Sequence, residues 1–372
     1  MNAMWREMSV GEFLRLEYGK PLHDADRKPN GMYPVYGANG EKDRSDKFYF
    51  DKPSIIVGRK GSAGEINLTE EKFWPLDVSY FVTFDERQHN LRFLYYLLTR
   101  LGLPSLAKGV KPGINRNEVY SQVTQIPPLP EQQRIVGILD EAFERIATAK
   151  ANAEKNLQNA RALFESHLQS VFTQRGPGWV EKLLGEVCVV KDGTHDSPKY
   201  VADGIPFVTQ KNIREDGLSF EKIKFISQED HDDFYRRSNA AHGDILISMI
   251  GANRGMACVV DDERTFSIKN VGLMKQGPSI NQQFLLYFLK SPQAASFVQS
   301  ASKGGAQEFV GLTELRRFPV PLPSLERQNA FAETFQSLHE ETQRLARLYK
   351  RKLALLAALK KSLLHQAFSG TL

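Results

Sequence analysis

The sequence predicts an α+β protein in which two similar α/β globular segments are separated by an antiparallel pair of long helices, with pseudo-two-fold symmetry. Three observations predict this fold class. A stretch from about Pro130 to Phe172 has a helical hydrophobic period, no further proline and a single glycine. A second such stretch runs from about Leu325 to Phe368. Shifting the sequence by 196 positions aligns the two stretches without a gap, which indicates an internal repeat.

The repeat covers the globular segments as well, where only anchor residues match. At the shift of 196, Pro127 falls on Pro323. The anchor Trp5 falls on Trp179 at a shift of 174, and Asn90 finds its match at a shift of 191. The growing shift predicts extra loop residues in the second globular segment. Duplicated domains commonly bind one kind of partner surface twice; a duplication kept only for folding is the alternative.

The repeat divides the chain into four segments. We expect globular domains at residues 1–125 and 176–320. Each is followed by a proline-rich connector and a long helix, at residues 126–175 and 321–372. A chain of 372 residues is long enough for two domains with separate cores.

Local patterns predict short strands and one helix in each globular segment. β-Branched runs bounded by glycine are typical of strands, and large apolar side chains at spacings of three and four are typical of a helix. The expected strands are Tyr33–Tyr36, Ser54–Val57, Ile205–Val208 and Asp244–Ser248, and the expected helices are Leu91–Leu101 and Phe284–Lys290. The glycine-rich runs Gly58–Gly64 and Gly251–Gly255 are expected turns.

Each globular segment ends in a proline-rich connector, Ile126–Pro130 in the first and Phe318–Pro323 in the second. Proline fixes φ, lacks an N–H and resists continuation of a sheet. We therefore expect both connectors to be stiff junctions that fix the orientation of each globular segment on its helix.

The two long helices carry complementary apolar stripes. The first stripe advances 36 residues in ten steps, a mean of 3.6, which predicts a nearly straight helix of about 60 Å. It is rich in alanine and the second is rich in leucine, and small side chains opposite large ones favour close packing. The first stripe is Ile135, Leu139, Ala142, Ile146, Ala149, Ala153, Leu157, Ala160, Phe164, Leu168 and Val171. The second is Phe331, Phe335, Leu338, Leu345, Tyr349, Leu353, Leu356, Leu364 and Ala367.

Chain connectivity predicts the direction of the helix pair. The first helix ends near Phe172, and the second globular segment begins almost at once, at Trp179. The same segment leads into the second helix through a short connector. If the helices pack along their length, they must be antiparallel. The globular segments are then expected at opposite ends, with Leu372 near Met1.

Composition is that of a globular protein, with 41% hydrophobic and 25% charged residues. The first ten residues carry charges where a signal peptide needs an apolar run, and no stretch approaches the roughly 18 apolar residues of a membrane span. Cys188 and Cys258 have no metal or redox spacing. We therefore expect two core cysteines in a reducing cytoplasm, and no membrane partner.

The net charge of +5 permits nucleic-acid binding without demanding it. Residues 321–372 hold eight basic and four acidic side chains, so the last helix is the most basic element. The globular segments are nearly neutral, with 18 basic and 16 acidic residues in 1–125 and 17 basic and 18 acidic residues in 176–320. Any DNA-reading surface there is expected to consist of local patches.

The sequence contains no recognisable catalytic motif. It has no GxxxxGK[ST] phosphate loop, no Asn-Pro-Pro-Tyr or Asp-Pro-Pro-Tyr tetrapeptide, and no GxSxG or HExxH motif. The run Asp192–Asp196 contains a histidine between acidic residues, which would suit a metal or acid–base site. It has no partner cluster and is equally typical of an Asx turn. We predict no catalytic residue and no metal site in this chain.

Taken together, these features resemble the specificity (S) subunits of type I restriction–modification enzymes. The stretch Ile126–Val136 looks like the central conserved region of that family, and Pro321–Gln328 like its distal copy, which departs from the Glu-Gln-Gln-Arg form. The runs Gly58–Gly64 and Asp192–His195 are further family-like strings. The resemblance covers essentially the whole chain, in duplicated order.

The resemblance implies a role for each segment. Each globular segment would be a target recognition domain that reads one half of a bipartite, asymmetric sequence in double-stranded DNA. The helices would set the unread spacer and dock two modification (M) subunits, which bind S-adenosylmethionine and methylate adenine N6 in each half-site. Restriction (R) subunits, when present, would add ATP- and Mg-dependent translocation and cleavage. This chain would itself be non-catalytic and hold no cofactor.

Loop residues are the natural candidates for DNA contacts, since polar side chains read base edges and Lys or Arg bind phosphates. In the first segment they are Arg59, Lys60, Lys108, Lys111, Asn115 and Arg116. In the second they are Lys199, Thr209, Lys211, Asn212, Arg254, Lys303 and Gln307. The candidates for M-subunit docking are Glu131, Gln132, Arg134, Gln328, Arg344, Arg347 and Arg351. The last three belong to a basic helix face that could instead contact spacer phosphates.

Two other classes of function remain as alternatives. A duplicated scaffold could hold two protein partners without reading DNA. A fused restriction–methylation enzyme is disfavoured because catalytic motifs are missing.

Overall fold

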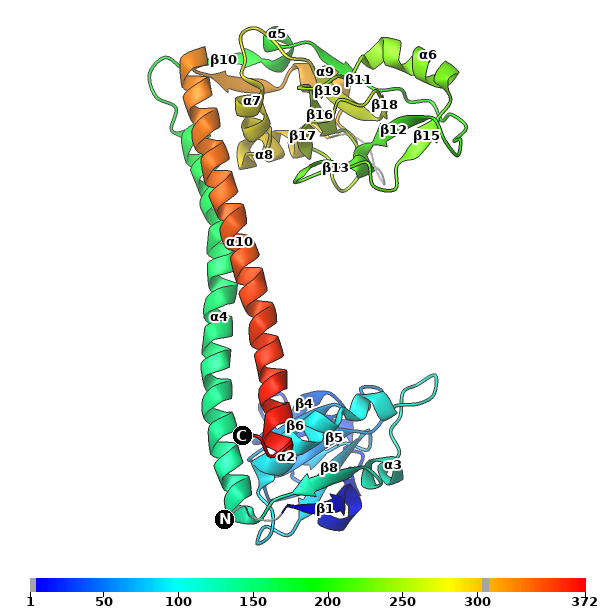
Figure 1. Cartoon of the computed structure of the whole chain (residues 1–372), viewed down its shortest axis with the longest axis vertical. Helices are drawn as coiled ribbons and strands as arrows, with labels where there is room; N and C mark the ends of the chain where they lie inside the picture. Colours follow the sequence, from blue (N-terminus) through cyan, green and yellow to red (C-terminus); the bar gives the residue numbers. More distant parts are fainter. Residues whose placement is uncertain (1–4, 303–307) are drawn as a thin grey trace. The chain divides into compact units, whose positions relative to one another are not determined.

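The computed structural model describes residues 5–302 and 308–372, which divide into two compact units (Figure 1). Unit 1 comprises Met1–Ala153 and Arg351–Leu372, and unit 2 comprises Glu154–Lys350. Each unit contains one globular domain and one stretch of each long helix.

The long helices are α4 (Leu129–Thr173) and α10 (Leu325–Phe368), and the ranges expected from the sequence are confirmed. Proline in the first turn of α4 costs no hydrogen bond, because the first N–H groups of a helix have no partner within it. The C-terminus of α10 is closed by Gly370, whose φ of +73° lies in the left-handed region that glycine adopts without strain. No helix in the described ranges is long and apolar enough to cross a membrane.

The two apolar stripes face away from solvent, as predicted. All positions of both stripes are buried or partly buried, whereas Leu163, Leu348, Leu355 and Leu359, which lie outside the stripes, are exposed. The helical period in the sequence therefore identified the packing face of each helix.

Within each unit the helix stretches are antiparallel, as expected. In unit 1, Arg134 donates to the carbonyl of Leu372 (2.9 Å), and Lys360 lies over the ring of Phe143 at 4.9 Å. In unit 2, the rings of Phe172 and Phe335 are 5.6 Å apart, and Phe164 contacts His339. In both units, positions rise along α4 as they fall along α10.

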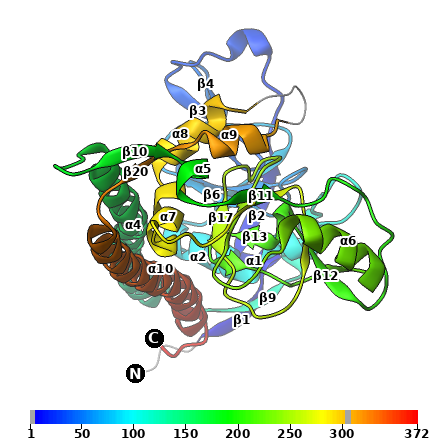
Figure 2. The same cartoon turned by 90° about the horizontal axis from the view of Figure 1, so that it is seen from above.

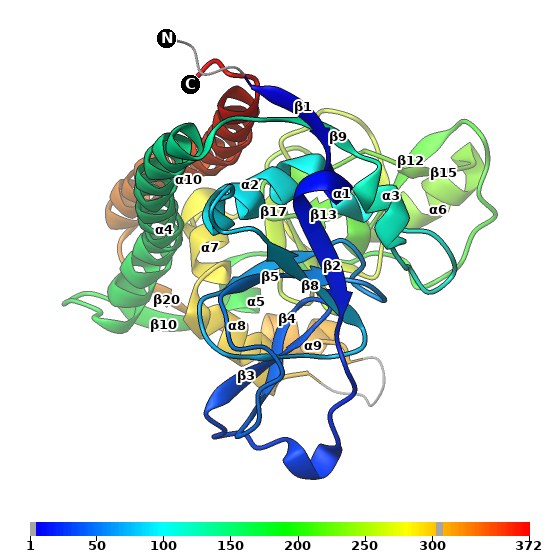
Figure 3. The same ribbon diagram turned by 90° about the horizontal axis from the view of Figure 1, so that it is seen from below.

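Unit 1 contains a four-stranded sheet (β2-β8-β5-β6), a three-stranded sheet (β4-β3-β7) and a two-stranded ribbon (β1-β9) (Figure 3). Its strands are β1 (Arg6–Ser9), β2 (Leu14–Tyr18), β3 (Tyr33–Gly37), β4 (Gly40–Ser45), β5 (Ser54–Gly58), β6 (Ile66–Thr69), β7 (Trp74–Pro75), β8 (Ser79–Phe84) and β9 (Val123–Ile126). Its helical elements, besides α4 and α10, are α1 (Val10–Phe13), η1 (Asp24–Asp26), α2 (Leu91–Leu101), η2 (Leu103–Leu106) and α3 (Arg116–Tyr120).

Unit 2 repeats this plan with sheets β11-β19-β16-β17 and β15-β12-β18 and the ribbon β10-β20 (Figure 2). Its strands are β10 (Val180–Leu183), β11 (Val190–Asp192), β12 (Ile205–Thr209), β13 (Ile213–Arg214), β14 (Gly217–Leu218), β15 (Lys224–Ile226), β16 (Ile245–Ser248), β17 (Ala257–Val259), β18 (Ser267–Lys269), β19 (Val271–Met274) and β20 (Pro319–Leu322). Its helical elements are α5 (Leu184–Val187), η3 (Gln210–Asn212), α6 (Gln228–Ser238), α7 (Gln282–Leu289), α8 (Pro292–Ser300) and α9 (Leu312–Arg316).

The predicted extra residues of the second domain fall mostly between two matched strands. Strand β12 starts 172 positions after β3, whereas β16 starts 191 positions after β5. The added residues form the hairpin β13–β14 and helix α6, which have no counterpart in unit 1. The insertion therefore leaves the register of the main sheet unchanged.

The second proline-rich connector is part of a sheet, although proline resists continuation of a sheet. Strand β20 contains Pro319 and Pro321 and pairs antiparallel with β10. The two prolines are two positions apart, so both N–H positions point to the same side of the strand. Because β20 has β10 as its single neighbour, the missing donors fall on its outer edge, and Val320 and Leu322 can maintain the pairing.

The helix that follows the main sheet packs on the long helices in each unit. In unit 1, α2 contacts α4 and α10: Tyr96 and Arg92 hydrogen-bond to Asp140, and the ring of Phe93 lies 5.1 Å from that of Phe368. In unit 2, α7 packs its phenylalanines on α4 in the same way (Phe172 to Phe288, 5.1 Å). The hydrophobic core of each domain thus continues into the helix pair.

The chain ends also belong to this core in unit 1. Both Trp5 and Leu372 pack against the same hydrophobic cluster. The expected approach of Leu372 to Met1 concerns a residue outside the described ranges.

A buried glutamine ties the start of each long helix to its domain; we call these two residues the latch glutamines. In unit 1, Gln132 accepts from the N–H of Asn90 (2.9 Å) and donates to the carbonyls of Gln88 (3.1 Å) and Pro127 (2.9 Å). Asn90 is in turn the N-cap of α2.

The second latch glutamine repeats these bonds in unit 2. Gln328 accepts from the N–H of Asn281 (2.9 Å), the N-cap of α7, and donates to the carbonyls of Ser279 (3.3 Å) and Pro323 (3.0 Å). With exposed fractions of 0% for Gln132 and 1% for Gln328, both side chains are sealed from solvent.

We expect Gln132→Ala to destabilise unit 1 by about 2–4 kcal/mol, because one N–H and two carbonyls lose their partner in a buried place. The measurement is the denaturant midpoint of the full chain. The matched control is the adjacent, exposed Gln133→Ala, which should change the free energy of unfolding by no more than about 0.5 kcal/mol. Equal midpoints for the two variants would contradict a structural role of Gln132.

Candidate nucleic-acid interface

Unit 1 brings all six of its predicted DNA-contacting residues onto one surface. Two loops meet there, residues 59–64 after β5 and residues 107–116 before and into α3; we call them the basic loop pair. The N–H of Gly61 donates to the carbonyl of Pro112 (2.8 Å), and that of Ile114 donates to the carbonyl of Arg59 (3.0 Å). The candidates on these loops are Arg59, Lys60, Lys108, Lys111, Asn115 and Arg116.

An exposed tyrosine that was not among the predicted residues contacts two arginines of this surface. Tyr18, the last residue of β2, is 45% exposed. The guanidinium carbons of Arg59 and Arg116 lie 5.1 Å and 4.9 Å from its ring centroid. Such cation–π contacts hold arginine side chains in place. One guanidinium N–H group of Arg59 also donates to the carbonyl of Asp77 (3.0 Å), and its other guanidinium N–H groups donate to no described residue. No local sequence signal places Tyr18 beside loops 41 and 98 residues away.

A second tyrosine supports the first from beneath. The ring of Tyr80 lies 5.1 Å from that of Tyr18, and its hydroxyl donates to the carbonyl of Ile114 (3.3 Å). Burial raises the pKa of Tyr80 to about 12, and the neighbouring Tyr18 adds to the rise. The hydroxyl of Tyr80 therefore stays protonated at physiological pH and keeps this hydrogen bond.

The remaining candidates of unit 1 differ in whether their side chains are free to contact DNA. Lys60 and Lys111 are exposed and pair with no acidic group in the described ranges. Lys108 forms an ion pair with Glu118. Asn115 caps α3 by accepting from the N–H of Asn117 (2.9 Å). The two unpaired lysines are thus the better candidates for phosphate contacts.

The candidates of unit 2 are more scattered. Lys199 and Lys211 are exposed, and neither forms an ion pair with a described residue. Thr209 caps η3 with its hydroxyl. Arg254, whose side chain is 15% exposed, is held by Glu308 at 2.6 Å. The two remaining expectations, Lys303 and Gln307, lie outside the described residues.

Asn212 has a structural role, which corrects the expectation of a DNA contact. It is 7% exposed. Its Oδ1 accepts from the N–H of Thr209 (2.9 Å) and its Nδ2 donates to the carbonyl of Ser219 (3.0 Å). Since both polar atoms are used inside the domain, we remove Asn212 from the candidate interface.

The run Asp192–Asp196 forms a turn, although not through Asp192. The hydroxyl of Thr194 accepts from the N–H of Asp196 (3.0 Å). The carboxylate of Asp192 instead binds Arg237 (2.7 Å) and His195 (3.2 Å). Among the described residues, no three His, Cys, Asp or Glu side chains gather closely enough to hold a metal ion.

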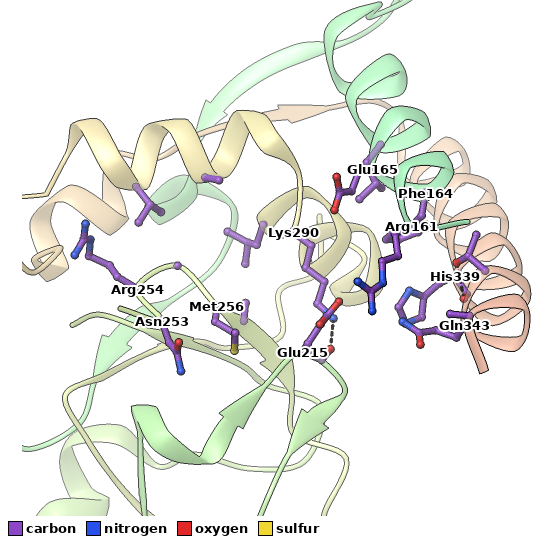
Figure 4. A pocket seen from close by; sticks show the side chains of 18 of the residues that line it. Arg161, Phe164, Glu165, Glu215, Asn253, Arg254, Met256, Lys290, His339 and Gln343 are labelled. Carbon is purple, nitrogen blue, oxygen red and sulfur yellow. Dashed lines mark hydrogen bonds between the residues drawn. The ribbon is translucent and has the colours of Figure 1, made fainter. Parts of the chain in front are cut away.

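A polar cleft of about 830 Å³ lies in unit 2 beside α4 and α10 (Figure 4). In Figure 4, Arg161, Lys290 and His339 turn toward one another, and Lys290 donates to the carbonyl of Glu215 (3.1 Å). Burial lowers the pKa of Lys290, and burial followed by the charge of Lys290 lowers that of His339. Glu165 and Glu215 also line the cleft, so it holds side chains of both signs of charge.

Comparison with known proteins identifies the family of the chain. The model of the type I restriction modification DNA specificity domain matches twice, over residues 2–158 and 177–351. The chain belongs to this specificity-domain family. The two matches correspond to the two copies of the repeat, so the duplication seen in the sequence is a duplication of the family's domain.

Curated relatives of this specificity-family chain span most of its length. The type I restriction enzyme EcoBI specificity subunit of Escherichia coli is 24% identical over 356 residues, covering 86% of this chain and 73% of the relative. The MjaVIII specificity subunit of Methanocaldococcus jannaschii is also 24% identical, covering 90% and 86%.

Solved structures share the fold. A chain from a study of complex assembly and conformational transition of the type I R-M system has a TM-score of 0.76 at 19% identity, covering 99% of this chain and 98% of that chain. The HsdS subunit from Thermoanaerobacter tengcongensis has a TM-score of 0.62 at 21% identity, covering 99% and 97%. At these identities the likeness concerns the fold alone.

The predicted docking residues of the specificity-family chain separate into two groups. The expectation that Gln132 and Gln328 offer a docking surface is wrong, because both are the buried latch glutamines. The others, which lie on the outside of the helices, are Glu131, Arg134, Arg344, Arg347 and Arg351.

The charged docking candidates are partly paired along their own helix. Glu131 binds Arg134 (2.7 Å), and this hydrogen bond lowers the pKa of the glutamate. Arg344 likewise binds Glu341 (2.6 Å). Arg347 and Arg351 are exposed and form no ion pair with any described residue, so this face of α10 carries uncompensated positive charge.

Proposed function

We propose that this chain is the DNA-reading subunit of a type I restriction–modification complex and is itself non-catalytic. Each globular domain reads one half of a bipartite, asymmetric sequence in double-stranded DNA. The observation that carries this proposal is the basic loop pair of unit 1, where two arginines are held against Tyr18 and the same loops carry two exposed lysines without an ion pair to a described residue. Arginine held in place reads guanine edges or phosphates, and free lysine binds phosphates.

The difference between the two domains supports an asymmetric target. The sheets repeat, but the loops that follow the matched strands carry different side chains, and only unit 2 has α6 and the β13–β14 hairpin. Two unlike reading surfaces on one frame have no reason to recognise a palindrome.

The long helices have two roles in the proposal. They set the unread spacer between the half-sites, and their outer faces dock two modification subunits. Those subunits supply S-adenosylmethionine and methylate adenine N6 in each half-site. Where restriction subunits join the complex, they supply ATP- and Mg-dependent translocation and cleavage.

Methylation mapping tests the reading role of unit 1. In cells that express the chain with its modification subunits, Arg59→Ala and Arg116→Ala should each weaken methylation at one half-site while the other half stays specific. A lost base-reading arginine costs about 1–3 kcal/mol, roughly a 5- to 100-fold loss of affinity.

The control for this test is Arg87→Ala, an arginine that is 89% exposed and far from the loop pair in sequence, which should leave the motif unchanged. A chain that retards DNA without any sequence preference would instead support the scaffold alternative.

Charge reversal on α10 separates the two partners proposed for its basic face. If Arg344, Arg347 and Arg351 dock a modification subunit, their combined replacement by Glu should abolish assembly in the absence of DNA. Contacts to spacer phosphates would leave assembly intact and flatten the salt dependence of DNA binding by about 0.9 in slope per lost contact. Analytical ultracentrifugation and binding titrations at several salt concentrations provide the two readouts, and wild-type values in both would refute both roles.

Matched changes in the two helices test the spacer role. Removing one turn of about four residues at matched positions of α4 and α10 shortens both by about 6 Å. The number of unread base pairs in the methylated motif should fall. An unchanged spacer in a folded, methylating complex would rule out this role.

A further inference from the structure

The two domains place different chemistry at one structurally equivalent site. In unit 1 this site holds Tyr18, which pairs with Tyr80, together with the first residue of α3, Arg116. The N–H of Gly19 donates to the carbonyl of Ser79 (3.1 Å) in unit 1, as that of Gly193 donates to the carbonyl of Val271 (3.0 Å) in unit 2. The Asp192–Gly272 pair therefore corresponds to the Tyr18–Tyr80 pair. Unit 2 therefore has neither the tyrosine nor the arginine at this place.

Arg59 is also missing from the equivalent site. Ser248 pairs with Val271 as Gly58 pairs with Ser79, so the residue after each pair is Met249 in unit 2 and Arg59 in unit 1. The N–H of Val310 donates to the carbonyl of Met249 (2.9 Å) as that of Ile114 donates to the carbonyl of Arg59 (3.0 Å). The first residue of α9 is Leu312 where α3 begins with Arg116. Two arginines are thus replaced by apolar side chains.

A pocket of about 590 Å³ occupies this site in unit 2. One wall is apolar and includes Ile250, Leu312 and Phe309. Phe309 pairs with Ile250 through an isolated β-bridge and is 45% exposed, although it is a large apolar side chain. An apolar wall left open in this way suits a ligand with a small apolar group.

The polar residues that line the pocket are held in one arrangement by a chain of hydrogen bonds. Arg237 donates twice to Oδ1 of Asp192 (3.0 and 2.7 Å), and Oδ2 of Asp192 lies 3.2 Å from Nε2 of His195. Nδ1 of His195 lies 2.7 Å from Oδ1 of Asn270. Arg237 comes from α6, the helix that unit 1 lacks.

Asn270 presents a donor to the pocket. Its φ of +53° lies in the left-handed region, which a residue other than glycine adopts at a cost and which is frequent at binding sites. With Oδ1 turned to His195, its Nδ2 donates to no atom of the described residues. One amide N–H pair of a residue that lines the pocket is therefore left without a partner among the described residues.

Apolar side chains and a hydrogen-bond donor in one pocket match one base edge. In the major groove, thymine presents its C5 methyl beside the acceptor O4, whereas adenine, guanine and cytosine have no methyl group there. We propose that this pocket reads a thymine of the second half-site, with the methyl against Phe309 and Ile250 and O4 accepting from Asn270. The inference rests on the proposed function. A half-site that contains a methylated adenine also contains a thymine, opposite that adenine.

The test uses the full chain with its modification subunits and a duplex that carries the methylated motif. Each thymine of the second half-site is replaced in turn by deoxyuridine, which removes only the methyl group. At one position the wild-type complex should lose about fourfold in affinity, the value of burying one such group at about 0.8 kcal/mol. Phe309→Ala should show a smaller difference between the two duplexes, because Ile250 alone then contacts the methyl group.

A matched control and a second variant sharpen the result. Phe48→Ala removes a phenylalanine of similar exposure (41%) in unit 1 and should keep the wild-type preference for thymine. Asn270→Gly keeps the left-handed backbone and removes the donor, so methylation mapping should show that position, and no position of the first half-site, becoming degenerate.

The outcomes separate this inference from the proposed function. If no thymine is sensitive to methyl removal, or if Phe309→Ala keeps the full sensitivity, the pocket does not read thymine, while a bipartite motif still supports the proposed function. If the wild-type complex methylates no bipartite motif, the proposed function fails and this inference fails with it.

Discussion

The architecture depends on one buried hydrogen-bonding arrangement that occurs twice. Each long helix begins with a glutamine whose amide satisfies three backbone groups of its own domain, one of them the N-cap of the helix that packs on the pair. A buried amide is favourable only when its partners are in place. Gln132 and Gln328 therefore fix the direction in which each long helix leaves its domain, and a reading surface is useful only if that direction is constant.

The helices could be predicted from the sequence because their signals are local and periodic. Residues such as Leu139, Ala153 and Leu168 recur at helical spacing, and this spacing alone predicted that they are buried. The burial of a residue could not be predicted where it depends on segments that are distant in the sequence. Gln132 and Gln328 follow charged neighbours in a motif typical of a surface, yet both are buried. Pro319 and Pro321 argue against a strand in the sequence. They are compatible with β20 because, among the described strands, β20 pairs with β10 alone and is therefore an edge strand.

The candidate interface was also predicted only in part from the sequence. Lysines and arginines in glycine-rich loops identified the basic loop pair, because short loops between strands must be exposed. The sequence could not reveal that Tyr18 lies between Arg59 and Arg116, since three distant segments meet there. In unit 2 it selected Asn212, whose amide is used internally, and missed Asn270, whose backbone conformation has no signature in the neighbouring residues.

The prolines of β20 have a consequence for association. The outer edge of the β10–β20 ribbon presents carbonyl groups at Pro319 and Pro321 but no N–H between them. A third strand approaching that edge would find acceptors without donors, so it could form only half of a ladder. The ribbon is thus protected against strand addition and edge-to-edge aggregation, next to the point where α10 begins.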